Sequence, residues 1–508
     1  MERMLNLKKP EQGTGLQVFL RLRPPHRQTV STSYTVNKDG NELITKSVKY
    51  RLEKHFGFTS IFDSSVDQRE VYERCVGPLI DAEEGLTIMM YGTSGSGKTY
   101  TLLGNDESIG IIPRALNHLF TNCRDRIQHI PIVKLIRGNI TALQDYASQK
   151  ELQVGQNVLD QCPALDSTTS FEDLGKVREK KEDGDEVVFF YISFMEIHNE
   201  VVYDLLAMPS QRFRKLNVVY NKGEVFVEGL SSVFVTNVED ALRLLQLGRQ
   251  RSTCAATPVN DRSSRSHCVF TLDMLKFNRS GFTTRAAFKF CDLAGSERVR
   301  TTDSTGERLE ETKNINTSLM VLGRCLDAAC SLSQGSKHVV IPHRESKLTL
   351  LLHAALLGKE KLIMMVALQP VDNFYEENQN VLNFAAIAKN IVFPEAVTKQ
   401  QVVSNCTGPL ELAIVPVVSR DEVLKQLEEE HLLLVERVAS LKAQQAIHLQ
   451  ALMECKEFCK KELICAYLEV RFEAAALRRQ LESEINALMK RCENLMRQNN
   501  SSSDQDIE

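Results

Sequence analysis

The sequence predicts an α/β domain with a central, mostly covered sheet, followed by a long helical segment. Three observations support this prediction. Between residues 16 and 395, short apolar runs typical of strands alternate with stretches of helical periodicity. One apolar run leads directly into the glycine-rich stretch 92–99. From 421 to 497 the chain contains no proline or glycine, and apolar residues recur there every three or four positions.

Composition narrows the class of protein. The 508 residues are 43% hydrophobic and 25% charged, which is ordinary for a soluble protein, and the net charge of −4 gives no general reason to expect nucleic acid. The first residues, MERMLNLKKPEQ, lack the apolar core of a signal peptide, and the apolar run at 362–368 is too short to cross a bilayer. Thirteen cysteines without a CxxC pair fit a reducing, intracellular compartment. We therefore expect neither a membrane span nor a nucleic-acid partner.

Individual elements follow from local patterns. Four apolar runs predict strands: 16–22, 87–91, 187–194 and 285–293. Residues 238–248 predict a helix that begins with a capping box formed by Thr236 and Glu239. The stretch 220–230 predicts a hairpin that turns at 221–223.

One internal segment differs from its surroundings. Residues 121–186 are polar, include the charged run KVREKKEDGDE and show little sustained periodicity. Loops of this length inside a compact domain are usually functional or disordered. We interpret the segment as an insertion on the surface of the domain.

The C-terminal part predicts an interrupted coiled coil over 421–497. Two runs of heptad spacing occur in different phases, the first at Leu424, Leu427, His431, Leu434, Val438 and Leu441, and the second at Leu481, Ile485, Leu488, Cys492 and Leu495. The alternative is an ordinary amphipathic helix packed on the globular domain. The last residues, 498–508, have the composition of a disordered tail.

The glycine-rich stretch matches the phosphate-binding pattern G-x-x-x-x-G-K-[ST]. Its eight residues are Gly92, Thr93, Ser94, Gly95, Ser96, Gly97, Lys98 and Thr99. The glycines allow backbone N–H groups to converge on an anion, Lys98 would neutralise the β- and γ-phosphates, and the Thr99 hydroxyl would bind Mg²⁺. A flexible glycine loop is the alternative. ATP is favoured over GTP, because a guanine-reading N-K-x-D sequence does not follow the loop.

Two further stretches could detect the γ-phosphate. NDRSSRSH at 260–267 concentrates hydroxyls and a guanidinium, although a polar turn would have the same composition. DLAGSE at 292–297 follows an apolar run, which places Asp292 at a strand end near Mg²⁺ and makes Gly295 a backbone donor. A strand-end aspartate is otherwise often only a turn residue.

In this order, GTSGSGKT, NDRSSRSH and DLAGSE resemble the three nucleotide-site motifs of the kinesin motor domain. The resemblance extends from about residue 16 to 391, apart from the insertion. It includes LRLRP, FDSSVDQREVY, EIHNEVVYDLL, NINTSLMVLGRCL, HRESKLTLLL and ENQNVLNFAAIAKNI. It implies a P-loop NTPase fold with a mixed sheet flanked by helices on both faces, and a microtubule-stimulated ATPase that uses ATP and Mg²⁺.

The resemblance also implies residue roles. The adenine would lie between Arg21, Arg23 and Pro24 on one side and Tyr100 on the other. The residues implied in hydrolysis are Lys98, Ser263, Ser264, Arg265, Gly295 and Glu297, with Arg265 pairing with Glu297 when both segments close on the γ-phosphate. The residues implied at Mg²⁺ are Thr99, Ser264 and Asp292.

A kinesin-like motor implies binding to the acidic microtubule surface. Similarity places the contacts within 298–350, with Arg300, Lys313, Arg344 and Lys347 as candidates. Here the sequence departs from the family pattern, because Leu350 stands at a position that is usually basic. Residues 297–311 also contain five acids against three arginines.

The insertion and the motifs NINTSLMVLGRCL and YISFMEIHNEVVYDLL resemble the mitotic kinesin-like, central-spindle branch. The expected parts are an N-terminal extension (1–15), a motor domain (16–395), an extended neck or linker (396–420), the coiled coil and the tail. So long a linker would transmit strain poorly between two heads. We therefore expect a homodimeric, non-processive motor on spindle midzone microtubules in the cytoplasm, plus-end directed by analogy. A structural microtubule crosslinker with a weak regulatory ATPase is the alternative.

We expect track binding to be weak or strongly salt-dependent, because exposed charge pairs are screened at physiological ionic strength and acids outnumber arginines in 297–311. Co-sedimentation with microtubules across a salt series measures this dependence. Tight binding that persists at high salt would contradict the expectation.

Overall fold

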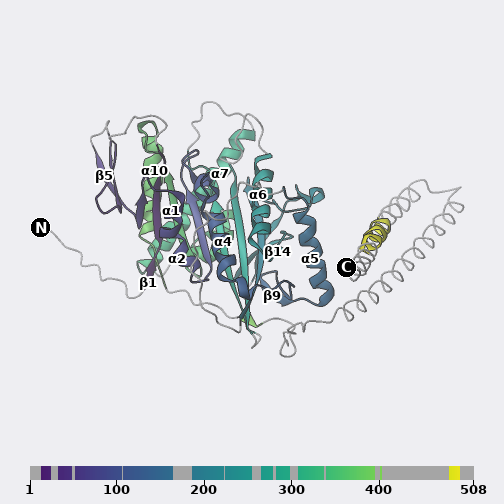
Figure 1. Cartoon of the computed structure of the whole chain (residues 1–508). Coiled ribbons are helices and arrows are strands. Elements are labelled where there is room, and N and C mark those ends of the chain that lie inside the picture. The colour runs from purple at the N-terminus through teal and green to yellow at the C-terminus, as the bar shows by residue number, and fades with distance from the viewer. Residues whose placement is uncertain are drawn as a thin grey trace, which may run out of the picture. The chain divides into compact units, whose positions relative to one another are not determined.

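A computed structural model describes most of the chain (Figure 1). The described residues are 13–24, 33–47, 52–105, 107–163, 186–221, 223–254, 265–278, 282–297, 307–336, 339–394, 401–402 and 480–491. The chain forms two compact units, Met1–Leu410 and Glu411–Glu508. The first unit contains the predicted nucleotide-binding motifs.

A ten-stranded mixed sheet forms the centre of the first unit. Its main path is β11 (Val201–Asp204), β10 (Glu186–His198), β15 (His267–Asn278), β16 (Phe282–Asp292), β7 (Leu86–Tyr91), β17 (Lys361–Leu368), β2 (Gln17–Leu22) and β6 (Ser60–Phe62). The strands from β16 to β6 are parallel, whereas β11, β10, β15 and β16 pair antiparallel. β14 (Val233–Val235) pairs with β10, and β19 (Gln401–Val402) pairs with β16. The predicted mixed sheet is confirmed.

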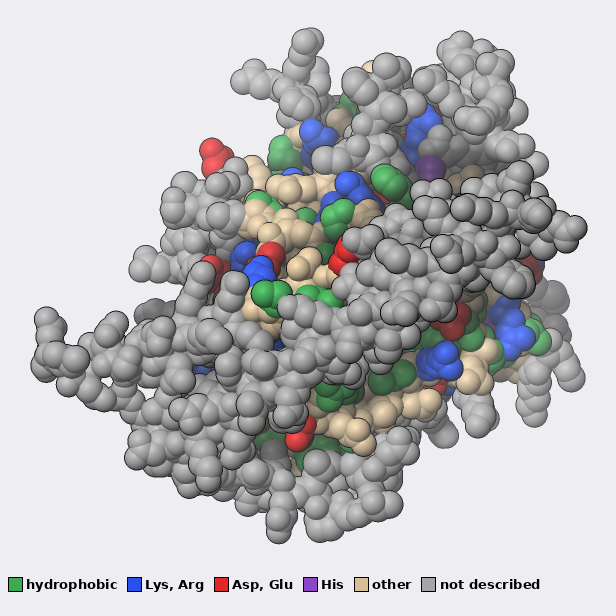
Figure 2. Space-filling model, turned by 90° about the vertical axis from the view of Figure 1, so that its right-hand side faces the viewer, with side chains coloured by type: hydrophobic (Ala, Val, Ile, Leu, Met, Phe, Trp, Pro, Cys, Tyr) green, Lys and Arg blue, Asp and Glu red, His purple; other side chains and the backbone are tan. Residues whose placement is uncertain are grey.

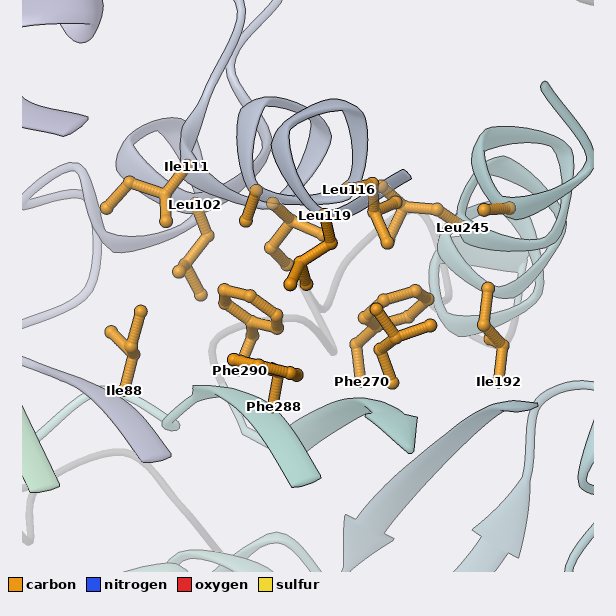
Figure 3. Packing of buried hydrophobic residues seen from close by; sticks show 14 of the residues in the cluster. Ile88, Leu102, Ile111, Leu116, Leu119, Ile192, Leu245, Phe270, Phe288 and Phe290 are labelled. Carbon is orange, nitrogen blue, oxygen red and sulfur yellow. The ribbon is translucent and has the colours of Figure 1, made fainter. Parts of the chain in front are cut away.

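Both faces of the sheet are covered, because successive residues of a strand point to opposite sides. In β7, Ile88 and Met90 belong to one hydrophobic cluster and Met89 and Tyr91 to the other. Figure 3 shows the first cluster, in which Phe288 and Phe290 of β16 face the helical residues Leu102 and Leu119. The second cluster contains residues from the helices α7, α8, α9 and α10.

The helices have the following bounds. They are α1 (Gln68–Cys75), α2 (Gly77–Ile80), α3 (Lys98–Leu103), α4 (Ile111–Asn122), α5 (Asp145–Leu159), α6 (Val238–Cys254), α7 (Glu307–Ser333), α8 (Lys347–Leu351), α9 (His353–Leu356) and α10 (Tyr375–Lys389). Short 3₁₀ turns lie at η1 (Arg124–Arg126), η3 (Pro209–Gln211), η5 (His343–Glu345) and η6 (Asp372–Phe374).

Small separate sheets accompany the central sheet. β3 (Tyr34–Val36), β4 (Glu42–Lys46) and β5 (Glu53–Gly57) form one, and β8 (Val133–Ile136) pairs with β9 (Asn139–Ala142). The predicted hairpin is confirmed as β12 (Asn217–Asn221) and β13 (Glu224–Glu228), with Gly223 at a φ of 90° in the turn. β1 (Gly13–Gly15) pairs with β18 (Val392–Pro394).

The predicted cap of α6 is wrong by one residue. The Asn237 side chain, rather than Thr236, accepts the hydrogen bond from the Asp240 N–H at 2.8 Å. Asn237 also donates to the Asp240 carboxylate at 2.8 Å, so Asp240 takes the place predicted for Glu239. Both pairs have the spacing of a capping box, so the pattern by itself did not separate them.

The segment 121–186, which we interpret as a surface insertion, contains regular structure before residue 164. It includes β8, β9 and the 15-residue helix α5, although its sequence shows little sustained periodicity. Its interpretation as an insertion stays a prediction. Val158 and Leu159 at the end of α5 are buried in the first core cluster. Residues 164–185 lie outside the described part of the chain.

Of the second unit, the structure describes a helical segment over 480–491. Leu481 and Ile485 are buried there, and Leu488 packs against them. These three residues belong to the second predicted heptad run, whereas the first run and the rest of 403–479 lie outside the described residues. The coiled coil therefore stays a prediction.

Among the described residues, no helix is both long and apolar enough to cross a membrane.

On the face drawn in Figure 2, acidic and basic side chains are interspersed among hydrophobic and polar ones. The described residues on that face therefore do not form a patch of a single charge.

We predict that Gly248→Ala destabilises the motor domain by about 1–2 kcal/mol, measured by denaturant unfolding. A Cβ at Gly248 in α6 would lie 2.1 Å from Cδ1 of the buried Phe194. The destabilisation from this overpacking is larger than the stabilisation that the higher helix propensity of alanine provides. Gly57→Ala is the control, because a Cβ at that position meets no atom within 4 Å. Equal stability of the two variants would contradict the prediction.

Candidate functional site

The glycine-rich loop lies between the C-terminal end of β7 and the first residue of α3. Gly92 and Gly97 adopt φ values of 148° and 104°, which L side chains rarely tolerate. At Gly92 a Cβ would also lie 2.2 Å from the Ala367 carbonyl oxygen of the neighbouring strand β17. The loop can therefore follow this path only with glycine at position 92, as expected of a phosphate-binding loop.

Lys98 is held against this loop. Its ammonium donates to the carbonyls of Gly92 at 3.0 Å and Thr93 at 2.8 Å, and only 7% of the residue is exposed. Burial lowers the pKa of Lys98, while the charges of Asp292 and Glu297 oppose this shift. A buried cation in a glycine-rich loop is suited to binding the phosphates of a nucleotide.

Thr99 and Asp292 meet across two neighbouring parallel strands. β7 precedes the loop, β16 ends at Asp292, and the Thr99 hydroxyl donates to Oδ2 of Asp292 at 2.5 Å. Oδ1 of Asp292 is buried and has no hydrogen-bond partner among the described residues. Burial raises the pKa of Asp292, whereas the Thr99 hydrogen bond and the Lys98 charge lower it. A hydroxyl beside a carboxylate with one unused buried oxygen fits the oxygen ligands that Mg²⁺ prefers.

The segment after Asp292 closes on the same loop. The Ser94 N–H donates to Oε2 of Glu297 at 2.8 Å, and the Ser296 N–H donates to the Gly92 carbonyl at 3.2 Å. A Cβ at Gly295 would lie 2.3 Å from the Glu297 carboxylate. Gly295 is therefore needed for the carboxylate to lie this close to the backbone, beside the position expected for the γ-phosphate.

The second phosphate-sensing segment is described only at its end. Ser263 and Ser264 lie outside the described residues, while Arg265, Ser266 and His267 lie within them. The Ser266 hydroxyl donates to the buried Glu196 at 2.6 Å, which fixes the chain where β15 begins. The pairing of Arg265 with Glu297 stays a prediction.

On the predicted adenine side, the four residues have different surroundings. The Arg21 guanidinium donates to Gln68 at 2.6 Å and to Thr101 at 3.0 Å, and lies 5.4 Å from the centroid of the Tyr100 ring. Arg23 donates to the Gly95 carbonyl, while Pro24 and Tyr100 are exposed. The exposed rings of Pro24 and Tyr100 are available to a base, whereas Arg21 supports the start of α3. The role of these four residues in adenine binding stays a prediction.

Sequence reasoning did not assign several residues that build the site. Gln68 also donates to the Tyr100 carbonyl at 2.6 Å, so it joins Arg21 to α3. Glu196 anchors Ser266, and the buried His267 contacts Ala294 and Ser318. Gln68, Glu196 and His267 lie inside stretches that resembled the family, so the motifs contained the signal without indicating the partners.

The comparisons with known proteins agree with this geometry. The family model described as the kinesin motor domain matches residues 21–391. The chain belongs to the kinesin family. Membership implies nucleotide binding and a microtubule-associated ATPase in general.

Individual kinesins are similar over much of the chain. Kinesin-like protein subito of Drosophila melanogaster is 50% identical over 533 residues, which cover 97% of this chain and 84% of that protein. Kinesin-like protein KIF20B of Homo sapiens is 31% identical over 431 residues, covering 76% of this chain but only 24% of the relative. The predicted resemblance to the central-spindle branch is confirmed.

A solved structure is similar in fold. It is a KIF14 dimer in the two-heads-bound state with AMP-PNP, in complex with a microtubule. The TM-score is 0.59 at 28% identity, and the match covers 76% of this chain and 97% of that one. Together with the family match, it supports the fold predicted for the motor domain.

The predicted track-contact residues are partly described. Arg344 is exposed in η5 and lies 4.4 Å from the Tyr220 ring centroid in the β12–β13 hairpin, and Lys347 begins α8. Leu350 is only 8% exposed, so it packs in the interior where the family pattern has a basic residue. Arg300 and the side chain of Lys313 lie outside the described residues.

We predict that Glu297→Ala retains ATP binding but loses hydrolysis by about a hundredfold or more, because the ion pair with Arg265 that closes both segments around the triphosphate cannot form. Steady-state ATPase and binding of a fluorescent ATP analogue measure the two effects. Glu53→Ala, which removes an exposed carboxylate on β5, should change neither. Normal turnover by Glu297→Ala would exclude the gating role.

Proposed function

We propose that this kinesin is an ATP-driven microtubule motor that acts in mitosis and cytokinesis at spindle midzone microtubules. The observation that carries the proposal is the contact of the glycine-rich loop with the segment 292–297. Thr99 bonds to Asp292 at 2.5 Å, and Ser94 bonds to Glu297 at 2.8 Å. These contacts support the proposal, because they join residues proposed to bind the phosphates and Mg²⁺ and to sense the γ-phosphate.

In the proposed mechanism, the loop and Lys98 would bind the phosphates. Thr99, Asp292 and Ser264 would hold Mg²⁺, which would neutralise charge on the phosphates when bound. Gly295 and Glu297 contact the γ-phosphate side of the site, with Arg265 closing from the other segment. Phosphoryl transfer needs mainly positioning and electrostatic stabilisation, so the closure of these segments would control hydrolysis. Loss of the γ-phosphate would release them and allow α7 to move.

The proposed partner is the microtubule, and the supporting residues lie on adjoining elements. Arg344 stacks on Tyr220 of the β12–β13 hairpin, and Glu200 accepts from the Lys347 N–H at 2.7 Å and from the Ser346 hydroxyl at 2.9 Å. These bonds fix the start of α8, at Lys347. The KIF14 structure in complex with a microtubule supports the same class of partner for this chain.

The proposed assembly is a homodimer through the helical segment, acting on the cytoskeleton and spindle. β19 pairs with β16, so part of the predicted linker 396–420 contacts the motor domain. The stretch 403–420 still allows up to about 3.4 Å per residue when extended. Such a tether supports a non-processive motor that bundles microtubules, and plus-end direction belongs to the same proposal.

A structural crosslinker with a weak regulatory ATPase is the second candidate. The buried Leu350 favours it, because α8 has no cation at that position to strengthen attachment to an acidic track. The intact residues Lys98, Thr99, Asp292 and Glu297 favour the motor.

A gliding assay on the full chain, run beside ATPase measurements with and without microtubules, separates the two candidates. The motor hypothesis predicts ATP-dependent gliding and microtubule-stimulated turnover, both reduced about a hundredfold or more in Asp292→Asn through loss of the Mg²⁺-side carboxylate. Asp39→Asn, at an exposed turn, is the control. Bundling without gliding or stimulation supports the crosslinker, and absence of microtubule binding refutes both.

A further inference from the structure

His267 is a buried side chain that the proposed hydrolysis does not use directly. It is the first residue of β15, its backbone pairs with Ile197 of β10, and only 2% of it is exposed. It directly follows Arg265 and Ser266, the described end of the hydroxyl-rich segment. Its ring therefore lies inside the domain, immediately behind the nucleotide site.

The two ring nitrogens contact two different elements. Nδ1 accepts the Ala294 N–H at 3.0 Å, and Nε2 lies 2.9 Å from the Ser318 hydroxyl in α7. Ala294 immediately precedes Gly295, and Ser318 is 2% exposed. One side chain thus joins the γ-phosphate-sensing segment 292–297 to α7.

The chemistry of these contacts fixes the state of the ring. A backbone N–H can only donate, so Nδ1 must carry a lone pair and the hydrogen of the neutral ring must be on Nε2. Nε2 then donates to the Ser318 hydroxyl. Burial, with a smaller contribution from the Lys98 charge, lowers the pKa of His267 to about 3, in agreement with a neutral ring.

We infer that His267 is a positioning residue that couples contact at the γ-phosphate to the placement of α7. When Gly295 shifts toward or away from a phosphate, Ala294 shifts with it, and the ring carries this displacement to Ser318. If α7 did not move with it, the buried Nε2–H of His267 would lose its acceptor on Ser318, and an unpaired buried donor is costly. The inference rests on the proposed ATP-driven function and adds a route by which the site acts on α7.

The contacts of α7 would transmit its displacement to a second helix, α10. Gly323 is five residues after Ser318, and a Cβ there would lie 3.3 Å from Phe384 of α10. Phe384 stacks on Tyr91, the last residue before the glycine-rich loop, with centroids 4.1 Å apart. A displacement of α7 would therefore reach α10, which leads to β18 and the neck.

The test compares Ser318→Ala, His267→Asn and wild type as full chains, each with ADP and with AMP-PNP. The first readout is hydrogen exchange of the amides of α7, and the second is the ratio of microtubule affinities in the two nucleotides. In wild type we expect α7 protection to differ between nucleotides. In both variants this difference should be lost and the affinity ratio should fall about five- to tenfold, with nucleotide affinity changed less than twofold.

Ser148→Ala is the matched control. Ser148 is also a buried serine, 4% exposed, whose hydroxyl donates to the Pro131 carbonyl at 2.7 Å in the insertion. The Ser148→Ala variant should lose a similar free energy of unfolding to Ser318→Ala. It should keep the wild-type dependence of α7 exchange and of microtubule affinity on the nucleotide. If Ser148→Ala alters the response as much as Ser318→Ala, the effect is general destabilisation and the inference is overturned.

Three further outcomes would overturn either the inference or the proposed function. A wild-type nucleotide response in Ser318→Ala overturns the inference, and this variant decides the test if His267→Asn fails to fold. Absence of any nucleotide-dependent change of α7 in wild type also overturns it. If wild type neither binds microtubules nor is stimulated by them, the proposed function fails, while the exchange measurement still decides the role of His267 because it needs only nucleotide.

Discussion

The hydrogen bond between Thr99 and Asp292 is the contact on which the nucleotide site depends. It joins the residue after Lys98 to the last residue of β16, and these two positions meet because β7 and β16 are parallel neighbours whose carboxyl ends share one edge of the sheet. The sheet is buried on both faces, so the edge cannot shift without disturbing two packed layers. A rigid support of this kind allows the loop and the segment 292–297 to be positioned to within the tolerance that phosphoryl transfer requires.

The two faces of the sheet serve different purposes. The face covered by α4 and α6 contains large aromatic and aliphatic side chains, such as Phe288 and Phe290, that pack closely together (Figure 3). The face covered by α7 and α10 contains the connections that can carry a signal, because Tyr91 stacks on Phe384 and Phe384 lies against Gly323. The absence of a side chain at Gly323 lets the two helices approach where this aromatic pair is located.

The predicted insertion contains a third region, beside α6. Arg243 of α6 donates to the Leu159 carbonyl at 2.9 Å, and Arg251 donates to Gln161 at 2.6 Å. Arg251 also donates to the carbonyls of Leu205 and Ala207, so the last turn of α6 is attached to both the insertion and the chain after β11. Because α6 leads toward the segment 255–264, the insertion supports the helix that precedes one of the predicted phosphate sensors.

Sequence alone determined the features that depend on neighbouring residues. The glycine-rich loop, the strand-end position of Asp292 and the β12–β13 turn follow from local backbone chemistry. The roles of Arg265, Gly295 and Glu297 came from the family resemblance and stay predictions. Tertiary structure decided the features that depend on distant partners. Helix α5 buries small residues such as Ser148 and Gly155 beside Val158, so its apolar periodicity is weak in the sequence. His267 finds its partners 27 and 51 positions away, and only the packing of β15 against the segment after β16 and against α7 brings them within hydrogen-bonding distance. Local patterns encode backbone conformation, whereas the partner of a buried polar group is fixed only when the core has assembled around it.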